Sequence, residues 1–92
     1  MSRMSFLPEL TEFLKKHGAI YTVRKYGAPV SIVTVDGVGR CKRRFVKVLY
    51  DKSDLVPYVC SSGFESIDAW WQKVLHFIPL YRTKYLYVVL VL

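Results

Sequence analysis

Acidic residues are scarce in this chain of 92 residues, which has seven Asp and Glu against fourteen Lys and Arg and a formal charge of +7. The shortage is also local, because nine basic residues but only one acidic residue, Asp36, lie between Phe13 and Tyr50. Such clustering favours a polyanionic partner, and RNA or another nucleic acid fits that description. A basic surface that serves only solubility is the alternative.

Residues that bind metals are few as well. Cys41 and Cys60 lie outside any CxxC spacing, and neither His17 nor His76 has a second histidine at ligand spacing. We therefore expect no metal and no other cofactor. The two cysteines are expected to be free thiols, with a disulfide between them as the alternative.

Long hydrophobic runs are missing too. The longest run, residues 85–92, is far shorter than the roughly 20 residues that a membrane-spanning helix needs. The first residues lack the apolar stretch of a signal peptide. We therefore predict a cytoplasmic protein with no membrane partner, of a size and apolar content (52%) that suit one globular domain over residues 1–92. Its oligomeric state is not indicated.

Two amphipathic helices are predicted from apolar residues at spacings of three and four. The first has Ser5 as its cap, tolerates Pro8 in its first turn and ends at Gly18. The second begins at Ser66 and ends at Pro79. The apolar stripes consist of Phe6, Leu7, Leu10, Phe13 and Leu14 in the first helix and of Ile67, Trp70, Trp71, Val74 and Ile78 in the second.

The stretch after Gly18 predicts a strand whose side chains alternate between two faces. Ile20, Thr22, Arg24 and Tyr26 share one face, and Tyr21, Val23 and Lys25 share the other. Because an unpaired guanidinium in an apolar core is costly, Thr22 and Arg24 on a half-buried strand predict a polar groove beside it.

Further strands are predicted at residues 30–35 and 40–50, with a break at Gly27-Ala28-Pro29, a hairpin turn at Asp36-Gly37 and a bulge or looser turn at Gly39. Residues 55–60 are predicted to be extended, with Pro57 at an edge or in a loop. The run 85–92 predicts a central strand that is buried on both faces. The result is an α+β fold: a small β-barrel of five or six mixed strands, with an N-terminal helix and a second helix before the last strand.

Two short motifs occur in a definite order, Thr22-Val23-Arg24 after Gly18 and Gly63-Phe64-Glu65-Ser66 before Trp70-Trp71. Together with the order of the predicted elements over nearly the whole chain, they resemble the ASCH domain of the PUA-like superfamily. In family members the first motif is commonly glycine, any residue, lysine, any two residues, threonine, any residue and arginine. The second motif is commonly glutamate-glycine-phenylalanine. The resemblance implies a PUA-like barrel with a groove beside it that suits RNA or a modified nucleoside.

A catalytic branch to which this family is similar hydrolyses the amide of N4-acetylcytidine with a lysine, a threonine and a glutamate. Alignment on the two motifs places Ala19 at the lysine and Ser62 at the glutamate, so that only Thr22 matches. An alanine cannot activate a neighbour, and a serine is no carboxylate base. We therefore predict a binding domain without catalytic residues. A nucleoside-processing, amidohydrolase-like enzyme with an altered site is the alternative. A third possibility is a protein-interaction module that pairs with another chain through its apolar last strand or an exposed tryptophan.

The predicted interface is a basic groove. Arg24 is its sharpest candidate, because a planar guanidinium can hold a phosphate or a base edge. The cations at residues 40–44 would neutralise phosphates, or else protect an edge strand from aggregation. Tyr21, Tyr26 and Tyr58 are candidates for stacking on bases. The predicted binding residues are Thr22, Arg24 and Lys25 on the floor of the groove, Arg40, Lys42, Arg43 and Arg44 as its charged wall, and Tyr21 beside them.

Overall fold

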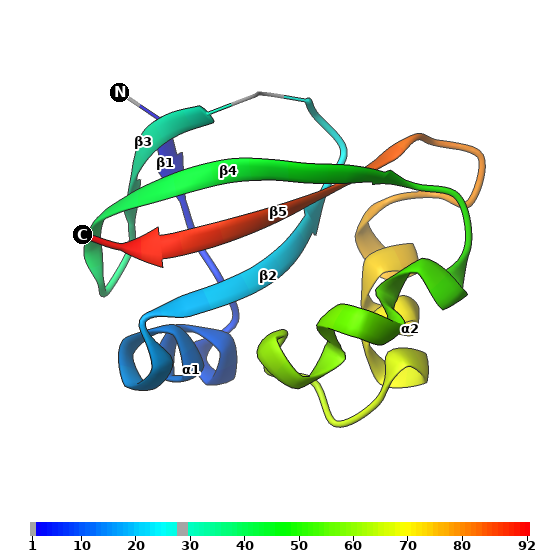
Figure 1. Cartoon of the computed structure of the whole chain (residues 1–92), viewed down its shortest axis with the longest axis horizontal. Coiled ribbons are helices and arrows are strands. Elements are labelled where there is room, and N and C mark those ends of the chain that lie inside the picture. The colour runs from blue at the N-terminus through cyan, green and yellow to red at the C-terminus, as the bar shows by residue number, and fades with distance from the viewer. Residues whose placement is uncertain (1, 28–29) are drawn as a thin grey trace.

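A computed structural model describes residues 2–27 and 30–92 of the chain. Within these ranges, five strands form one mixed sheet in the order β1-β3-β4-β5-β2. The sheet curls into a half-barrel, with one helix before β2 and two helical segments before β5 (Figure 1). The α+β class, the N-terminal helix and the second helix before the last strand are therefore confirmed. The radius of gyration is 12.2 Å.

Helix α1 (Pro8–His17) ends as predicted but begins later than predicted. Gly18 stops the helix in a left-handed conformation, with φ of 79°, and its N–H donates to the carbonyl of Leu14 over 2.8 Å. The expected cap at Ser5 is wrong, because Leu7 occupies the N-cap and no side chain caps the helix. Pro8 sets this start, since its fixed φ suits the first helical position, where its missing N–H is no loss.

Strand β5 (Lys84–Val91) is central, as its apolar sequence predicts. It is antiparallel both to β2 (Ala19–Arg24) and to β4 (Gly39–Leu49). Leu86, Tyr87 and Val89 are buried on its two faces. Because both of its edges are already paired, β5 cannot add a strand from another chain.

Strand β3 (Val30–Val35) forms the predicted hairpin with β4. The turn between them requires glycine, because Gly37 and Gly39 have φ of 83° and 109°. The only register shift along the β4–β5 pairing lies between Phe45 and Lys47, further along than the bulge or looser turn expected at Gly39. Of the predicted break at Gly27-Ala28-Pro29, the last two residues lie outside the described residues.

Strand β1 (Ser2–Met4) was not predicted. It runs parallel to β3 through three residue pairs, from Ser2 opposite Val33 to Met4 opposite Val35. A strand this short carries no periodic signal, so its place in the sheet depends on pairing with a segment distant in sequence.

A 3₁₀ helix, η1 (Lys52–Ser61), replaces the extended segment that was predicted at residues 55–60. The Asp54 carboxylate accepts hydrogen bonds from the N–H groups of Tyr50 and Asp51, over 2.8 and 3.1 Å, and thereby closes a capping box. Pro57 fits inside this helix because its fixed φ also suits helical backbone. The following helix, α2 (Ile67–Phe77), begins after Ser66 as predicted, and the Ser66 hydroxyl accepts from the Ala69 N–H.

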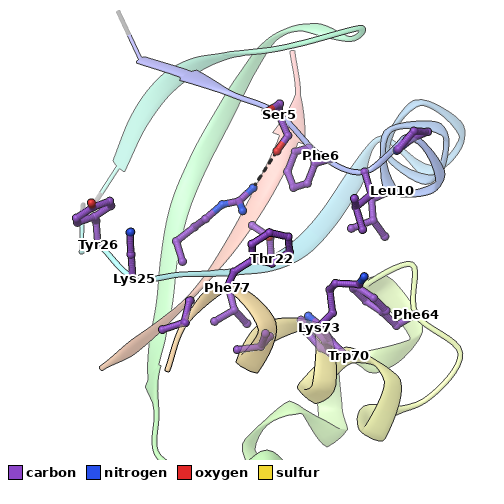
Figure 2. Close-up of a pocket in the computed structure, with 16 residues that line it drawn as sticks. Ser5, Phe6, Leu10, Thr22, Lys25, Tyr26, Phe64, Trp70, Lys73 and Phe77 are labelled. Atoms are coloured by element: carbon purple, nitrogen blue, oxygen red, sulfur yellow. Dashed lines mark hydrogen bonds between the residues drawn. The ribbon is translucent and has the colours of Figure 1, made fainter. Parts of the chain in front are cut away.

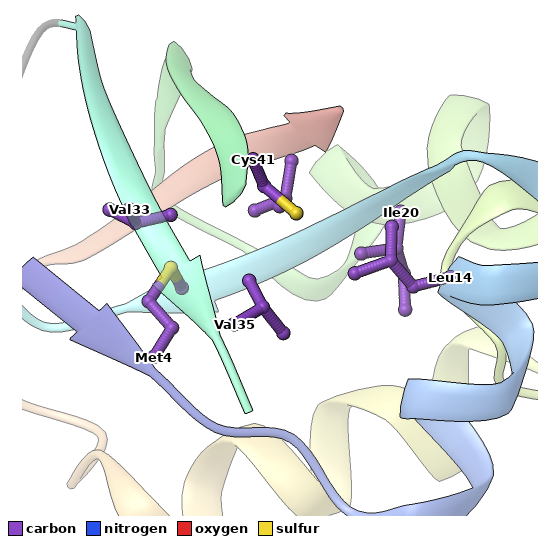
Figure 3. Packing of buried hydrophobic residues seen from close by; sticks show 7 residues of the cluster. Met4, Leu14, Ile20, Val33, Val35 and Cys41 are labelled. Atoms are coloured by element: carbon purple, nitrogen blue, oxygen red, sulfur yellow. The ribbon is translucent and has the colours of Figure 1, made fainter. Parts of the chain in front are cut away.

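Two apolar clusters lie on opposite faces of the sheet. We call the face that carries Ile20 and Val89 the inner face, and α1 closes one end of it through Leu14 (Figure 3). The outer face packs against η1 and α2 at the other end of the sheet. The inner cluster consists of Met4, Leu14, Ile20, Val33, Val35, Cys41 and Val89, and the outer cluster of Val23, Leu49, Leu55, Trp70, Val74, Ile78 and Leu86.

The curl brings the two edges of the sheet toward each other. Strands β1 and β2 are the outermost strands, yet a guanidinium nitrogen of Arg24 on β2 lies 3.5 Å from the carbonyl oxygen of Ser5, just after β1. The inner face is therefore concave, and its end remote from α1 is the place where polar side chains gather.

Candidate nucleic-acid interface

A groove of about 530 Å³ runs along the unpaired edge of β2. One wall is the segment that joins β1 to α1, the other is the face of α2 together with Phe64, and β2 forms the floor (Figure 2). None of its lining residues is acidic. We call this the β2 groove, and it is lined by Ser5, Phe6, Leu7, Pro8, Leu10, Thr22, Val23, Arg24, Lys25, Tyr26, Phe64, Trp70, Lys73, Val74, Phe77 and Ile78.

Strand β2 places its polar residues as the alternation predicted. Thr22 lies opposite Tyr87 and Arg24 opposite Tyr85 in the register with β5, so both side chains belong to the same face as Ile20. Lys25, which follows the strand, also lines the groove. Since β2 is an edge strand, residues from both of its faces reach the groove.

Arg24 is the best-defined cation of the groove. Its guanidinium lies 5.0 Å from the ring centre of Phe6 and donates a hydrogen bond of 3.5 Å to the Ser5 carbonyl. Burial lowers the pKa of Arg24 from its ordinary value, and the positive charge of Arg43 lowers it further. Arginine nevertheless stays protonated in proteins, so the site keeps a partly buried positive charge.

Aromatic side chains of the groove differ in how accessible they are. Trp70 is only 2% exposed and stacks against Phe64 at 6.1 Å, so it supports the wall from within. Phe77 is 62% exposed and Tyr26 is 69% exposed. Both rings lie at the groove, where the Lys25 ammonium is 5.4 Å from the centre of the Tyr26 ring and the His76 ring meets Phe77 edge-on at 4.8 Å. Exposed rings of this kind are what an unpaired base requires for stacking.

The basic cluster at residues 40–44 divides between the two faces of the sheet. In the pairing with β3, Arg43 lies opposite Ser31, whereas Lys42 and Arg44 lie opposite Ile32 and Val30. Arg43 therefore joins Arg24 on the inner face. Arg40, Lys42 and Arg44 project from the outer face and do not line the β2 groove, so their contact with phosphates stays a prediction for a separate surface.

The three tyrosines expected to stack on bases also lie in different places. The rings of Tyr21 and Tyr58 pack against each other, 4.9 Å apart, beside the outer cluster. Neither of them lines the β2 groove, whereas Tyr26 does.

Ser62 and Ala19 align with the glutamate and the lysine of the catalytic branch described above, and neither lines the groove. Ser62 is fully buried. Its hydroxyl donates to the Val59 carbonyl over 2.7 Å and accepts from the Phe64 N–H over 3.1 Å, so it holds the turn between η1 and α2. Ala19, at the start of β2, does not line the groove. Of the three aligned positions, only Thr22 borders it.

Most of the apolar lining of the groove was not predicted from the sequence, and neither were its cation Lys73 and its rings Phe6 and Phe77. Phe6 was assigned to the stripe of the first helix, but it lies before Pro8 and therefore outside α1. Phe77 is three residues after Val74 and thus continues the apolar stripe of α2. The ring is exposed because Phe77 does not pack against the sheet beneath α2. Sequence periodicity does not indicate which residues of an apolar stripe the sheet covers.

The described part of the chain contains no group of three or more His, Cys, Asp or Glu side chains arranged to hold a metal ion. Both cysteines are free, Cys41 buried and Cys60 exposed. None of the described helices has the length and apolar character needed to traverse a bilayer. No protein-family model, no curated protein and no solved structure matches this chain.

Proposed function

We propose that this protein binds single-stranded RNA through the β2 groove. The observation that carries the proposal is a groove with apolar walls, exposed rings and three cations, lined by no acidic residue. Single-stranded RNA is recognised by stacking of splayed bases on aromatic rings and by cations along the phosphates. In this arrangement Phe77 and Tyr26 supply the rings, and Arg24, Lys25 and Lys73 supply the positive charge. The resemblance to ASCH domains supports the same class of ligand.

The shape of the groove favours unpaired over paired nucleic acid. Its volume of about 530 Å³ is that of a pocket for a small organic group. A base can enter it only after leaving a stack, whereas the rings at its rim cannot reach the faces of bases inside a duplex. A duplex would meet only the charges outside the groove.

Fluorescence anisotropy with labelled single-stranded RNA, duplex RNA and duplex DNA at several salt concentrations tests the proposal. We expect single-stranded RNA to bind most tightly and to keep this preference as salt rises, because stacking is not screened by counterions. Weak binding of all three that disappears together with added salt would contradict the proposal and assign the charge to solubility.

Single substitutions locate the interface. Phe77→Ala should weaken binding by about 1–3 kcal/mol through lost stacking. Arg24→Gln should weaken it as well and lower the salt slope by about one unit if it contacts one phosphate. Arg82→Gln is the matched control, since it removes the same charge from an exposed loop residue that does not line the groove. Equal affinities for all three variants would exclude the groove as the site.

A triple variant tests the outer face. Arg40, Lys42 and Arg44 are exposed on the opposite face of the sheet, so their joint replacement by Gln leaves the groove intact. We expect mainly a loss of salt-dependent affinity, with the preference for single-stranded RNA unchanged. Loss of that preference in the triple variant, without an effect of Phe77→Ala, would move the interface to the outer face.

A further inference from the structure

Two arginines lie together on the concave inner face, and no acidic side chain among the described residues pairs with either of them. Arg24 comes from β2 and Arg43 from β4, on either side of the central strand β5. The ring of Tyr87 on β5 lies between these strands, and the Arg43 guanidinium carbon is 5.3 Å from its centre. The two positive charges are close enough for Arg43 to lower the pKa of Arg24.

Among the described residues, no ion pair compensates these charges. The four ion pairs found among the described residues involve Arg3, Lys15, Lys47 and Lys52, and none of them involves Arg24 or Arg43. Arg24 has only a long contact to a neutral carbonyl and an aromatic ring. In the part of the chain that the structure describes, the Nε atom of Arg43 is buried without any hydrogen-bond partner.

A second unpaired group lies beside Arg43. The hydroxyl oxygen of Ser31 is buried without a partner among the described residues, and Ser31 lies directly opposite Arg43 in the β3–β4 pairing. Buried polar groups are nearly always paired in folded proteins, and burying a charge without a partner is costly. Arg43 lines a cavity and Ser31 does not, so the guanidinium of Arg43 is the group that a ligand can reach.

A cavity opens at this place. It has a volume of about 310 Å³, and we call it the arginine cavity. Three of its six lining residues are arginines, and none is acidic. It is lined by Arg3, Met4, Ser5, Arg24, Tyr26 and Arg43. Arg3 already pairs with Asp36 over 3.2 Å at the surface, which leaves Arg24 and Arg43 as the two uncompensated charges.

The position of the arginine cavity limits what can enter it. It shares Ser5, Arg24 and Tyr26 with the β2 groove, so the two spaces adjoin. Met4 on its wall belongs to the inner apolar cluster, which fills the concave face as far as α1. A continuous nucleic-acid backbone cannot pass through that cluster, whereas a group at the end of a strand can enter the cavity from the groove.

We propose that the arginine cavity binds a phosphate monoester, held between the guanidinium groups of Arg24 and Arg43. A monoester carries a charge close to −2 near neutral pH, which matches two unpaired arginines, whereas a backbone phosphodiester or a carboxylate carries only −1. Guanidinium forks bind phosphate oxygens through paired, charge-assisted hydrogen bonds. The monoester is the terminal phosphate of an RNA strand or the phosphate of a free mononucleotide. The first of these rests on the proposed function, because the strand then lies in the β2 groove.

The test is isothermal titration calorimetry in phosphate-free buffer with hexauridylate that carries a 5′-phosphate, a 3′-phosphate or only hydroxyl ends, and with uridine monophosphate. We expect one of the phosphorylated ends to tighten binding of the wild-type protein at least tenfold over the hydroxyl form. Arg43→Gln should abolish this difference. Lys42→Gln, one residue away on the outer face, should retain it.

The outcomes separate the two proposals. If hexauridylate binds but its terminal phosphate has no effect, the arginine cavity is excluded and the groove proposal stands. If no hexauridylate binds while uridine monophosphate binds in a manner that Arg43→Gln abolishes, the cavity stands and the RNA proposal falls. A phosphate effect that persists in Arg43→Gln would overturn the assignment to this pair.

Thermal unfolding shows whether the Arg43→Gln variant is still folded. Because Arg43 is half-buried and its Nε atom has no hydrogen-bond partner among the described residues, its replacement by Gln should leave the melting temperature in phosphate-free buffer unchanged or higher. Added inorganic phosphate should raise the melting temperature of the wild type and of Lys42→Gln but not of Arg43→Gln. An equal shift in all three proteins would overturn the proposal.

Discussion

Gly63 sets the distance between the two walls of the β2 groove, and its replacement by Ala provides a sharp test of the structure. Gly63 has a φ of 82°, and a Cβ added there would lie 2.7 Å from Cδ2 of Leu10 and about 3.5 Å from Phe13. Leu10 and Phe64, the residue after Gly63, both line the groove. The turn before α2 therefore rests directly on α1.

The expected decrease in the free energy of unfolding has a backbone part and a side-chain part. A left-handed backbone costs a residue with a Cβ about 1–2 kcal/mol, and the stiffer unfolded chain of the Ala variant returns about 0.4–1 kcal/mol. Displacing Leu10 from its rotamer adds about 0.5–1.5 kcal/mol. We therefore expect Gly63→Ala to lower the free energy of unfolding by about 2 kcal/mol.

Gly18→Ala is the matched control, because Gly18 has nearly the same φ, 79°, but no atom within 4 Å of an added Cβ. It should lose only the backbone part, about 1 kcal/mol. Urea unfolding gives both values, and in a domain of this size the difference corresponds to a melting temperature that is lower by roughly 4–8 °C.

The contact itself is tested by repeating Gly63→Ala in a Leu10→Ala background. The extra cost should disappear there, which appears as a coupling energy of more than about 0.5 kcal/mol in the double-mutant cycle. Equal losses for Gly18→Ala and Gly63→Ala, or the absence of coupling, would refute the close packing of the two walls.

Three further predictions concern other parts of the fold. Lys84→Met should destabilise the protein by about 1–3 kcal/mol in urea unfolding, because the buried ammonium of Lys84 donates to the carbonyls of Pro79, Leu80 and Arg82 and the variant leaves these unpaired. Asp54→Asn should lower the melting temperature at neutral pH. The N–H groups of Tyr50 and Asp51 hold the pKa of Asp54 below its ordinary value, so this stabilisation exists above the ordinary carboxyl pKa and vanishes as the pH falls through the folded value. The difference between variant and wild type should therefore shrink in acid. A maleimide reagent should label Cys60 but not Cys41 in the native protein, because Cys41 is fully buried and burial raises the pKa of its thiol; labelling of both before unfolding would contradict the inner cluster.

Helices and strands that are determined by their own local sequence could be predicted. The two α-helices, the hairpin at Asp36-Gly37 and the central last strand follow from apolar periodicity, glycine conformation and a run that is apolar on both faces. Strand β1 was not predictable, because its three residues acquire their structure only by pairing with β3. The 3₁₀ helix was mistaken for an extended segment because Pro57 fits both backbones, and the capping box formed by Asp51 and Asp54 was overlooked.

The candidate site was predictable only in part. Alternation along β2 predicted that Thr22 and Arg24 share one face. The four basic residues at positions 40–44 were predicted to form one wall, whereas the pairing of β4 with β3 separates Arg43 from the other three. The meeting of Arg24 with Arg43 depends on strand order, since β5 lies between β2 and β4. Lys73 and Phe77 join the groove only because α2 packs beside β2. Local sequence patterns indicate neither the strand order nor the packing of α2 beside β2.

The central position of β5 also has a consequence for how the protein folds. Strand β2 pairs with no strand other than β5 among the described residues, and Ala19 lies opposite Leu90. During synthesis the N-terminal helix and β2 are therefore made long before their partner, whereas the β3–β4 hairpin can close at once. Sequence-distant pairing of this kind slows folding, because a long loop must close before any contact compensates for it. We therefore expect the floor of the β2 groove to be among the last parts of the molecule to form, once β5 has been inserted between β2 and β4.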